Sequence, residues 1–274
     1  MNWIYRNSGD FYLNGTVALE EYFGHLKKRR EKHPYGISHL HMKEFKKNGF
    51  CKIPQVFSAE MIGGLNQEFQ ACVKQQKVKH DDEYFTMIGD PLLNSKTSFD
   101  IAVSDVIFDF SRSFFKCTPS LCTQNLRLSK LNEKQPKSTQ LFHCDQNSLS
   151  FIKCFIYLND VDLEGGPLTY VKGSHAKKPQ NHLKQYRWSK KEMIDLYGEQ
   201  SITYLTASSG DLLIADTTGF HCGTKPQKIE RKMLTLNYVI HKERNTNRLF
   251  KTKKEWVNDL PEEKKPLFDF METV

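Results

Sequence analysis

Asn125-Leu126-Arg127-Leu128-Ser129-Lys130-Leu131 alternates polar and apolar side chains from Asn125 to Ser129. Successive side chains of a β-strand point to opposite faces, so this alternation predicts a half-buried strand. Further strands are predicted where apolar, β-branched and aromatic runs follow turn residues: Phe151 to Leu158, Pro167 to Val171, Asp211 to Ala215 and Lys232 to Ile240. Several short strands between turns are typical of a barrel or sandwich. We therefore predict a mainly β fold with flanking helices around a double-stranded β-helix, or jelly roll.

Helical signals precede the strands. Ser58-Ala-Glu-Met-Ile matches an N-cap followed by an acidic first turn. Apolar residues at helical spacing then give this helix one buried face: Met61, Leu65, Phe69 and Val73. Other helices are predicted around Val17 to Lys32 and from Ile101 to Phe115. The sequence of residues 45–57 predicts the end of a helix, a turn at Gly49 and a short strand.

The 274 residues suffice for one large domain. We interpret residues 1–40 as an N-terminal extension and residues 41–274 as a single jelly-roll domain. Residues 176–200 interrupt the β pattern with Lys, His and aromatic residues, and Ser189 to Glu192 forms a capping box that predicts a short helix. An insertion of this length between strands is often a lid or a binding loop.

Composition indicates a folded protein in a reducing compartment. Hydrophobic residues make up 38% of the chain and aromatic residues 12%, which is enough for a substantial core. The seven cysteines are odd in number and show no CxxC spacing, which argues against a disulfide framework or a structural zinc site. The apolar runs are too short to span a membrane, and the N-terminus lacks the order of a signal peptide. We expect a cytoplasmic protein without a membrane partner.

Positive charge is placed unevenly along the chain. The formal net charge is +8, and residues 225–254 alone hold ten Lys or Arg and two Glu. A second basic stretch covers 27–32. Such segments attract anions, although a solvated surface would look the same. We expect a small, anionic organic substrate rather than a nucleic acid, while a protein or nucleic-acid substrate stays open.

Two short segments carry the chemistry: Phe142-His143-Cys144-Asp145 and Phe220-His221. Two imidazoles and one carboxylate are the ligands of the facial triad of non-haem Fe(II) oxygenases, which leaves three metal positions open. His143 and Asp145 share one side of an extended segment because strand side chains alternate. Zinc could use the same ligands, and the three residues could also be structural.

Arg231 supplies a fourth element. It opens the strand Lys232 to Ile240, which we expect to pair beside the strand leading to His221. A guanidinium there can hold a carboxylate through two parallel hydrogen bonds.

Together these segments resemble the phytanoyl-CoA dioxygenase family over roughly residues 40 to 240. The similar stretches are Leu141 to Gln146, Phe155 to Asp162, Gly165 to Leu168, Gly173 to His175, Gly210 to Ile214 and His221 to Arg231. The resemblance implies a cupin-like jelly roll that uses Fe(II), 2-oxoglutarate and O2 and releases succinate and CO2. It also implies that His143, Asp145 and His221 bind Fe(II), and that Arg231 binds the distal carboxylate of 2-oxoglutarate. Because Asp145 is present, hydroxylation of a C–H bond or another oxidation is favoured over halogenation.

The chain departs from the family at one position. The family often has a hydroxyl two residues after the distal histidine, where this sequence has Gly223, with Thr224 next. Thr224 and Asn125 are our candidates for an additional co-substrate contact, and Arg127 shares a strand face with Asn125. We interpret His175 as structural, and His182 and His241 as surface residues. The alternative to an enzyme is an inactive or non-enzymatic basic binding module on a dioxygenase scaffold.

Overall fold

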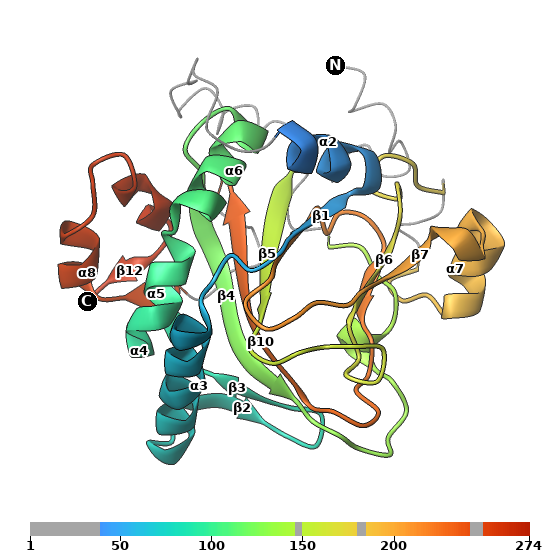
Figure 1. Cartoon of the computed structure of the whole chain (residues 1–274), viewed down its shortest axis with the longest axis horizontal. Coiled ribbons are helices and arrows are strands. Elements are labelled where there is room, and N and C mark those ends of the chain that lie inside the picture. Colours follow the sequence, from blue (N-terminus) through green and yellow to red (C-terminus); the bar gives the residue numbers. More distant parts are fainter. Residues whose placement is uncertain (1–38, 146–149, 180–184, 242–248) are drawn as a thin grey trace.

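The computed structural model describes residues 39–145, 150–179, 185–241 and 249–274. Two antiparallel sheets face each other, and helices cover the outer face of the larger sheet (Figure 1). The predicted jelly roll with flanking helices is therefore confirmed. The helix expected around Val17 to Lys32 lies outside the described residues, and the role of 1–40 as an extension stays a prediction. No helix in the described ranges combines the length and apolar character that crossing a membrane requires.

The larger sheet has seven strands, and every neighbouring pair is antiparallel. Their order is β1 (Phe50–Ile53), β8 (Leu212–Ala215), β5 (Phe151–Tyr157), β10 (Arg231–Val239), β4 (Ser120–Ser129), β3 (Phe85–Ile88) and β2 (Val78–Asp81). The smaller sheet has the order β7 (Ile202–Leu205), β6 (Leu168–Val171) and β9 (His221–Gly223). A parallel pair joins β11 (Lys251–Thr252) to β12 (Glu272–Thr273). The sequence analysis missed β2, β3, β7, β9, β11 and β12, because runs this short show little periodicity.

The helices of the described residues are α2 (His39–Asn48), α3 (Ala59–Lys74), α4 (Pro91–Asn94), α5 (Lys96–Ala102), α6 (Asp105–Phe115), α7 (Lys190–Tyr197) and α8 (Lys254–Asn258). Ser58 caps α3 as predicted, since its hydroxyl accepts a hydrogen bond from the Met61 N–H at 3.2 Å. The buried face of α3 is rotated from the predicted one, with Ile62 and Cys72 inside and Val73 36% exposed. The capping box at Ser189 begins α7 as predicted.

The helix predicted from Ile101 to Phe115 is two helices. Helix α5 ends at Ala102 and α6 begins at Asp105. Ser104 has an extended backbone, and its hydroxyl donates to the Ile101 carbonyl at 2.8 Å. A serine side chain that bonds a nearby backbone carbonyl competes with the continuation of a helix. The apolar spacing on both sides of Ser104 hid this break from the sequence analysis.

Alternation along the strands divides the interior into two parts. In β5, Ile152, Cys154 and Ile156 join the core beneath the helices, whereas Phe155 and Tyr157 pack between the two sheets. Strand β10 divides in the same way. Its Leu234 faces the helices beside Leu126 and Ile156, and its Met233 faces the smaller sheet beside Arg127 and Tyr157. Polar residues at the inward positions of β4, β5 and β10 therefore meet in the space between the sheets.

Replacing Leu234 by alanine tests the helix-side core. Leu234 is fully buried in the middle of the larger sheet. We expect L234A to lower the free energy of unfolding by about 2–5 kcal/mol, because the change removes buried methyl groups and leaves a cavity. Urea unfolding measures this loss. The control is L163A, because Leu163 is 59% exposed, and an equal loss in both variants would contradict the assignment of this core.

Candidate active site

A short antiparallel backbone pair brings the two predicted histidine ligands together. The His143 N–H donates to the His221 carbonyl at 2.9 Å, and the His221 N–H donates to the His143 carbonyl at 3.0 Å. Side chains of directly paired residues project on the same face. The two imidazole rings accordingly lie with their centroids 4.3 Å apart.

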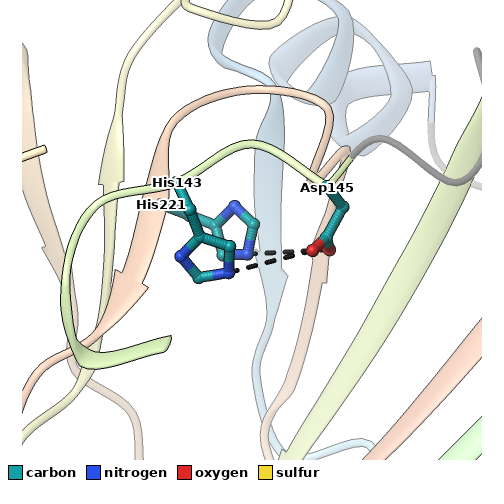
Figure 2. A group of neighbouring side chains, drawn as sticks. All are labelled: His143, Asp145 and His221. Carbon is teal, nitrogen blue, oxygen red and sulfur yellow. Dashed lines mark ion pairs between the residues drawn. The ribbon is translucent and has the colours of Figure 1, made fainter. Parts of the chain in front are cut away.

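Asp145 completes the group from the segment that follows His143. Its backbone N–H donates to the Thr217 carbonyl at 2.8 Å, which fixes the segment beside the turn before His221. Figure 2 shows its carboxylate directed at both rings, with Oδ1 3.8 Å from His143 Nε2 and Oδ2 3.7 Å from His221 Nε2. The three ligand atoms lie within 4.8 Å of one another. The structure thus brings together the three residues predicted from the sequence.

Hydrogen bonds orient both imidazoles for metal binding. His143 Nδ1 lies 2.9 Å from the Leu141 carbonyl oxygen, and His221 Nδ1 lies 3.0 Å from the Gly219 carbonyl oxygen. A carbonyl can only accept, so each Nδ1 carries the proton and each Nε2 keeps its lone pair. A backbone carbonyl behind a ligating histidine fixes its tautomer and ring orientation. The donor set therefore fits a divalent metal.

The protonation states of the three residues agree with metal binding. Burial lowers the pKa of His221 to about 3, with a further contribution from His143, and burial also lowers the pKa of His143. For Asp145, burial opposes ionisation, but Lys153 and the two imidazoles outweigh it and lower the pKa of the carboxyl. Two neutral imidazoles and one carboxylate are the forms that metal ligands require.

A cavity of about 140 Å³ adjoins the triad and lies between the two sheets. Inward residues of the larger sheet line one side of it, namely Asn125, Arg127, Lys153, Phe155, Arg231, Met233 and Thr235. The opposite side includes Leu168, His221 and Gly223. A larger cavity of about 660 Å³ borders other residues of the smaller sheet, and it includes none of the triad.

Arg231 and Arg127 converge at one end of the triad cavity. Arg231 is 3% exposed, and its guanidinium donates to the Thr224 carbonyl at 3.4 Å and to the Ser129 hydroxyl at 3.3 Å. The Nε atoms of both arginines are buried without a hydrogen-bond partner. Among the described residues, no carboxylate pairs with either guanidinium. Two guanidiniums without a carboxylate partner in the lining of one cavity fit the carboxylate of a bound ligand.

Glycine at position 223 leaves room between these guanidiniums. A Cβ at Gly223 would lie 3.1 Å from Arg231 Nη2 and 3.8 Å from Arg127 Nη2. Burial, and next the charge of Arg231, lower the pKa of Arg127 to about 10, so both side chains remain cationic at neutral pH. At Gly223, where the family often has a hydroxyl, this chain therefore places two guanidiniums nearby.

The predicted neighbour of the Arg231 strand was wrong. Strand β10 pairs with β4 and β5, whereas β8, which precedes His221, pairs with β1 and β5. The two strands share β5 as a neighbour but do not contact each other. Arg231 instead enters the cavity from the larger sheet, opposite Gly223 of the smaller sheet.

The structure separates the two candidates for an additional co-substrate contact. Asn125 lines the triad cavity, whereas the Thr224 hydroxyl bonds to the Thr169 hydroxyl at 2.7 Å and lines the larger cavity. Thr224 contributes its backbone carbonyl to Arg231 instead. The Thr224 side chain lies outside the triad cavity because neighbouring residues in an extended segment point to opposite sides, and Gly223 faces the cavity.

The remaining sequence interpretations have mixed outcomes. Cys144 and Cys222 pack in an apolar cluster away from the triad, as predicted, and His175 stays outside the triad with Nε2 3.2 Å from the Lys46 carbonyl oxygen. His241 was predicted at the surface but is 8% exposed, so that prediction was wrong. It lies two residues after the end of the buried strand β10. His182 lies outside the described residues.

Lys153 is the residue of the cavity that the sequence analysis missed. It stands at an inward position of β5, and its Nζ lies 2.5 Å from Asp145 Oδ2. The signal was a single charge within the otherwise apolar strand Phe151-Ile-Lys-Cys-Phe-Ile-Tyr157. Lys and Arg are almost never buried in a strand without a partner.

Comparison with known proteins agrees with this fold and site. The family model described as phytanoyl-CoA dioxygenase (PhyH) matches residues 45–226, and the chain belongs to this family. It is thus an enzyme of the class of 2-oxoglutarate-dependent non-haem iron oxygenases, as the sequence resemblance predicted. None of the curated proteins compared with the chain matches it.

Solved structures share the fold at low sequence identity. The epimerase SnoN in complex with Fe3+, alpha ketoglutarate and nogalamycin RO is 16% identical with a TM-score of 0.59, over 81% of this chain and 90% of that one. HygX from Streptomyces hygroscopicus with nickel, 2-oxoglutarate and hygromycin B is 16% identical with a TM-score of 0.58, over 74% and 87%. EctD from S. alaskensis with bound Fe is 15% identical with a TM-score of 0.59, over 77% and 80%.

The lowered histidine pKa values predict acid sensitivity of the metal-free protein. A buried neutral histidine must gain a proton as the pH falls, and the unfolded chain gains it more easily. Stability is therefore full above the ordinary pKa of about 6.5 and declines between about pH 6.5 and pH 4. We expect chelator-treated wild type to lose roughly 2–3 kcal/mol over this range because of His221. Urea unfolding at each pH measures the loss.

The matched variant is H221Q, which removes the titrating group. Its free energy of unfolding should depend less steeply on pH between 4 and 6.5 than that of wild type. Identical slopes would show that His221 does not have a depressed pKa.

Proposed function

We propose that this protein is an Fe(II)- and 2-oxoglutarate-dependent dioxygenase that hydroxylates a C–H bond of a small, anionic organic substrate. Succinate and CO2 would be the co-products. The observation that supports this most strongly is the pairing of a His143, Asp145 and His221 ligand group with two buried, unpaired guanidiniums across one cavity. The metal group alone suits several reactions, whereas the arginine pair adds a site for a carboxylate.

His143, Asp145 and His221 would hold Fe(II), which, when bound together with 2-oxoglutarate and O2, supplies the oxidative chemistry. Arg231 and Arg127 would hold the distal carboxylate of the co-substrate. The Leu141 and Gly219 carbonyls would keep the imidazole Nε2 atoms directed at the metal. Aliphatic and aromatic neighbours such as Leu168, Phe155 and Met233 would limit access of water.

An anionic substrate is supported by the balance of charge in the cavity. Arg127, Arg231 and Lys153 contribute three positive charges to its lining, against the single negative charge of Asp145. Fe(II) and dianionic 2-oxoglutarate would leave this balance unchanged, because their charges cancel. The basic segment 225–254 also favours an anionic substrate.

The fold family includes other outcomes of the same chemistry. Among the similar structures are an epimerase, SnoN, and a carbocyclase, SnoK, both from nogalamycin biosynthesis. Hydroxylation is our proposal among these outcomes, and the presence of Asp145 argues against halogenation. The lid-like role of residues 176–200, the single domain from 41 to 274 and the cytoplasmic location stay predictions.

The cofactor pair is tested by anaerobic addition of Fe(II) and 2-oxoglutarate. We expect a weak visible metal-to-ligand charge-transfer band in the wild type. It should be lost in H143A and D145A, because each removes a ligand, and hydroxylation should be abolished in D145A. Absence of the band in folded, iron-loaded wild type would favour a zinc enzyme or an inactive scaffold.

The role of Arg231 is tested by titrating 2-oxoglutarate against the same band. R231A should raise the concentration for half-saturation by at least about tenfold, because a lost charge-assisted pair costs about 2–3 kcal/mol. The control is R112A, since Arg112 pairs with Glu263 outside the cavity. An unchanged requirement in R231A would remove Arg231 from co-substrate binding.

A further inference from the structure

Lys153 occupies an unusual position for a cation. It stands on β5, where it pairs in register with Ala215 of β8 and Asn237 of β10. Side chains two residues apart in a strand point to the same face, so Lys153 shares the face of Phe155 and Tyr157 and enters the space between the sheets. Its Nζ reaches Asp145 Oδ2 at 2.5 Å, and the side chains of this pair are 21% and 19% exposed. A pair this close and this shielded is stronger than an ion pair in open solvent.

The ammonium lies where it competes with a metal ion. Oδ2 is the carboxylate oxygen that is 3.7 Å from His221 Nε2, so the lysine and the two imidazoles converge on one carboxylate. Among the described residues, Lys153 is the one permanently charged group paired with Asp145, because the two imidazoles beside it are neutral. A divalent cation bound by this carboxylate would sit close to a like charge, and it would also weaken the ion pair that Asp145 already has.

We propose that Lys153 is a positioning residue that acts as the internal counter-ion of Asp145 and sets the metal affinity of the site. Its contact with Oδ2 holds the carboxylate directed into the cavity when no metal is bound. The same charge reduces the affinity for a divalent ion, because the metal must displace Lys153 from the Asp145 carboxylate in order to bind there. This inference rests on the proposed function in one respect only, the assignment of Asp145 as a metal ligand.

Substitution of Lys153 by methionine separates these effects. Methionine keeps an unbranched side chain of similar length but carries no charge. In K153M, Asp145 becomes a shielded anion without its counter-ion, which destabilises the metal-free fold. The same change removes the like charge beside the metal. Stability without metal should therefore fall while metal affinity rises, a combination that loss of packing alone would not produce.

The experiment is a calorimetric titration of chelator-treated full-length protein with Co²⁺ at fixed neutral pH. Co²⁺ accepts imidazole and carboxylate ligands and avoids oxidation of Fe(II). We expect K153M to bind Co²⁺ at least tenfold more tightly than the wild type. K153R, which keeps the charge, should stay within about threefold of the wild type. Thermal unfolding should show a lower midpoint for metal-free K153M and a larger rise on adding Co²⁺.

The control is K232M. Lys232 lies on β10 and donates to the Asn66 side chain at 3.2 Å on the helix side of the sheet, away from the cavity. Its Co²⁺ affinity should equal that of the wild type. Equal or weaker Co²⁺ binding by folded K153M would overturn the counter-ion role while leaving the metal site intact. Absence of Co²⁺ binding in the wild type as well would overturn both this inference and the proposed function.

Discussion

The backbone pair between His143 and His221 is the contact on which the candidate site depends. It joins the segment between β4 and β5 of the larger sheet to β9 of the smaller sheet, and it places two imidazoles on one face with their centroids 4.3 Å apart. Asp145 reaches the same face because it is two positions beyond His143 in an extended segment. A shift of one residue in this pairing would turn His143 and Asp145 away together. The register of one short bridge therefore determines whether the three ligands meet.

Local pattern explains which parts of this arrangement could be predicted from the sequence. The alternation in β4 and the two-residue spacing of His143 and Asp145 follow from strand geometry alone. Strand β4 contains Asn125 to Ser129 of the predicted strand but starts at Ser120, and the structure places His143 and Asp145 beside each other. The order of strands does not follow from local pattern, because a jelly roll pairs segments that are distant in sequence. The neighbour of the Arg231 strand was wrong for this reason. The break at Ser104 was missed because one serine hydroxyl decided it within an apolar run.

The electrostatic environment shows why the cavity is better explained by a ligand than by structure alone. Burial of unpaired cations is costly, and apolar residues of similar size often stabilise a protein more than buried charges do. Arg127 and Arg231 are nevertheless held side by side without a carboxylate among the described residues, and each Nε lacks a hydrogen-bond partner. An inactive scaffold would gain nothing from this arrangement. A dianionic co-substrate would neutralise it and satisfy the buried donors.

Gly223 connects this electrostatic argument to the departure from the family pattern. A hydroxyl-bearing side chain at this position would place its Cβ 3.1 Å from Arg231 Nη2, closer than most side-chain contacts allow. Arg127 extends from β4 toward the same gap, so a second guanidinium lies close to Gly223. Two cations attract a carboxylate more strongly than one cation with a neutral donor, and here they concentrate positive charge in one part of the cavity lining. Lys153 adds positive charge beside the metal ligands. Among the described residues that line the cavity, the three cations thus face a single opposing charge, the carboxylate that the metal would use.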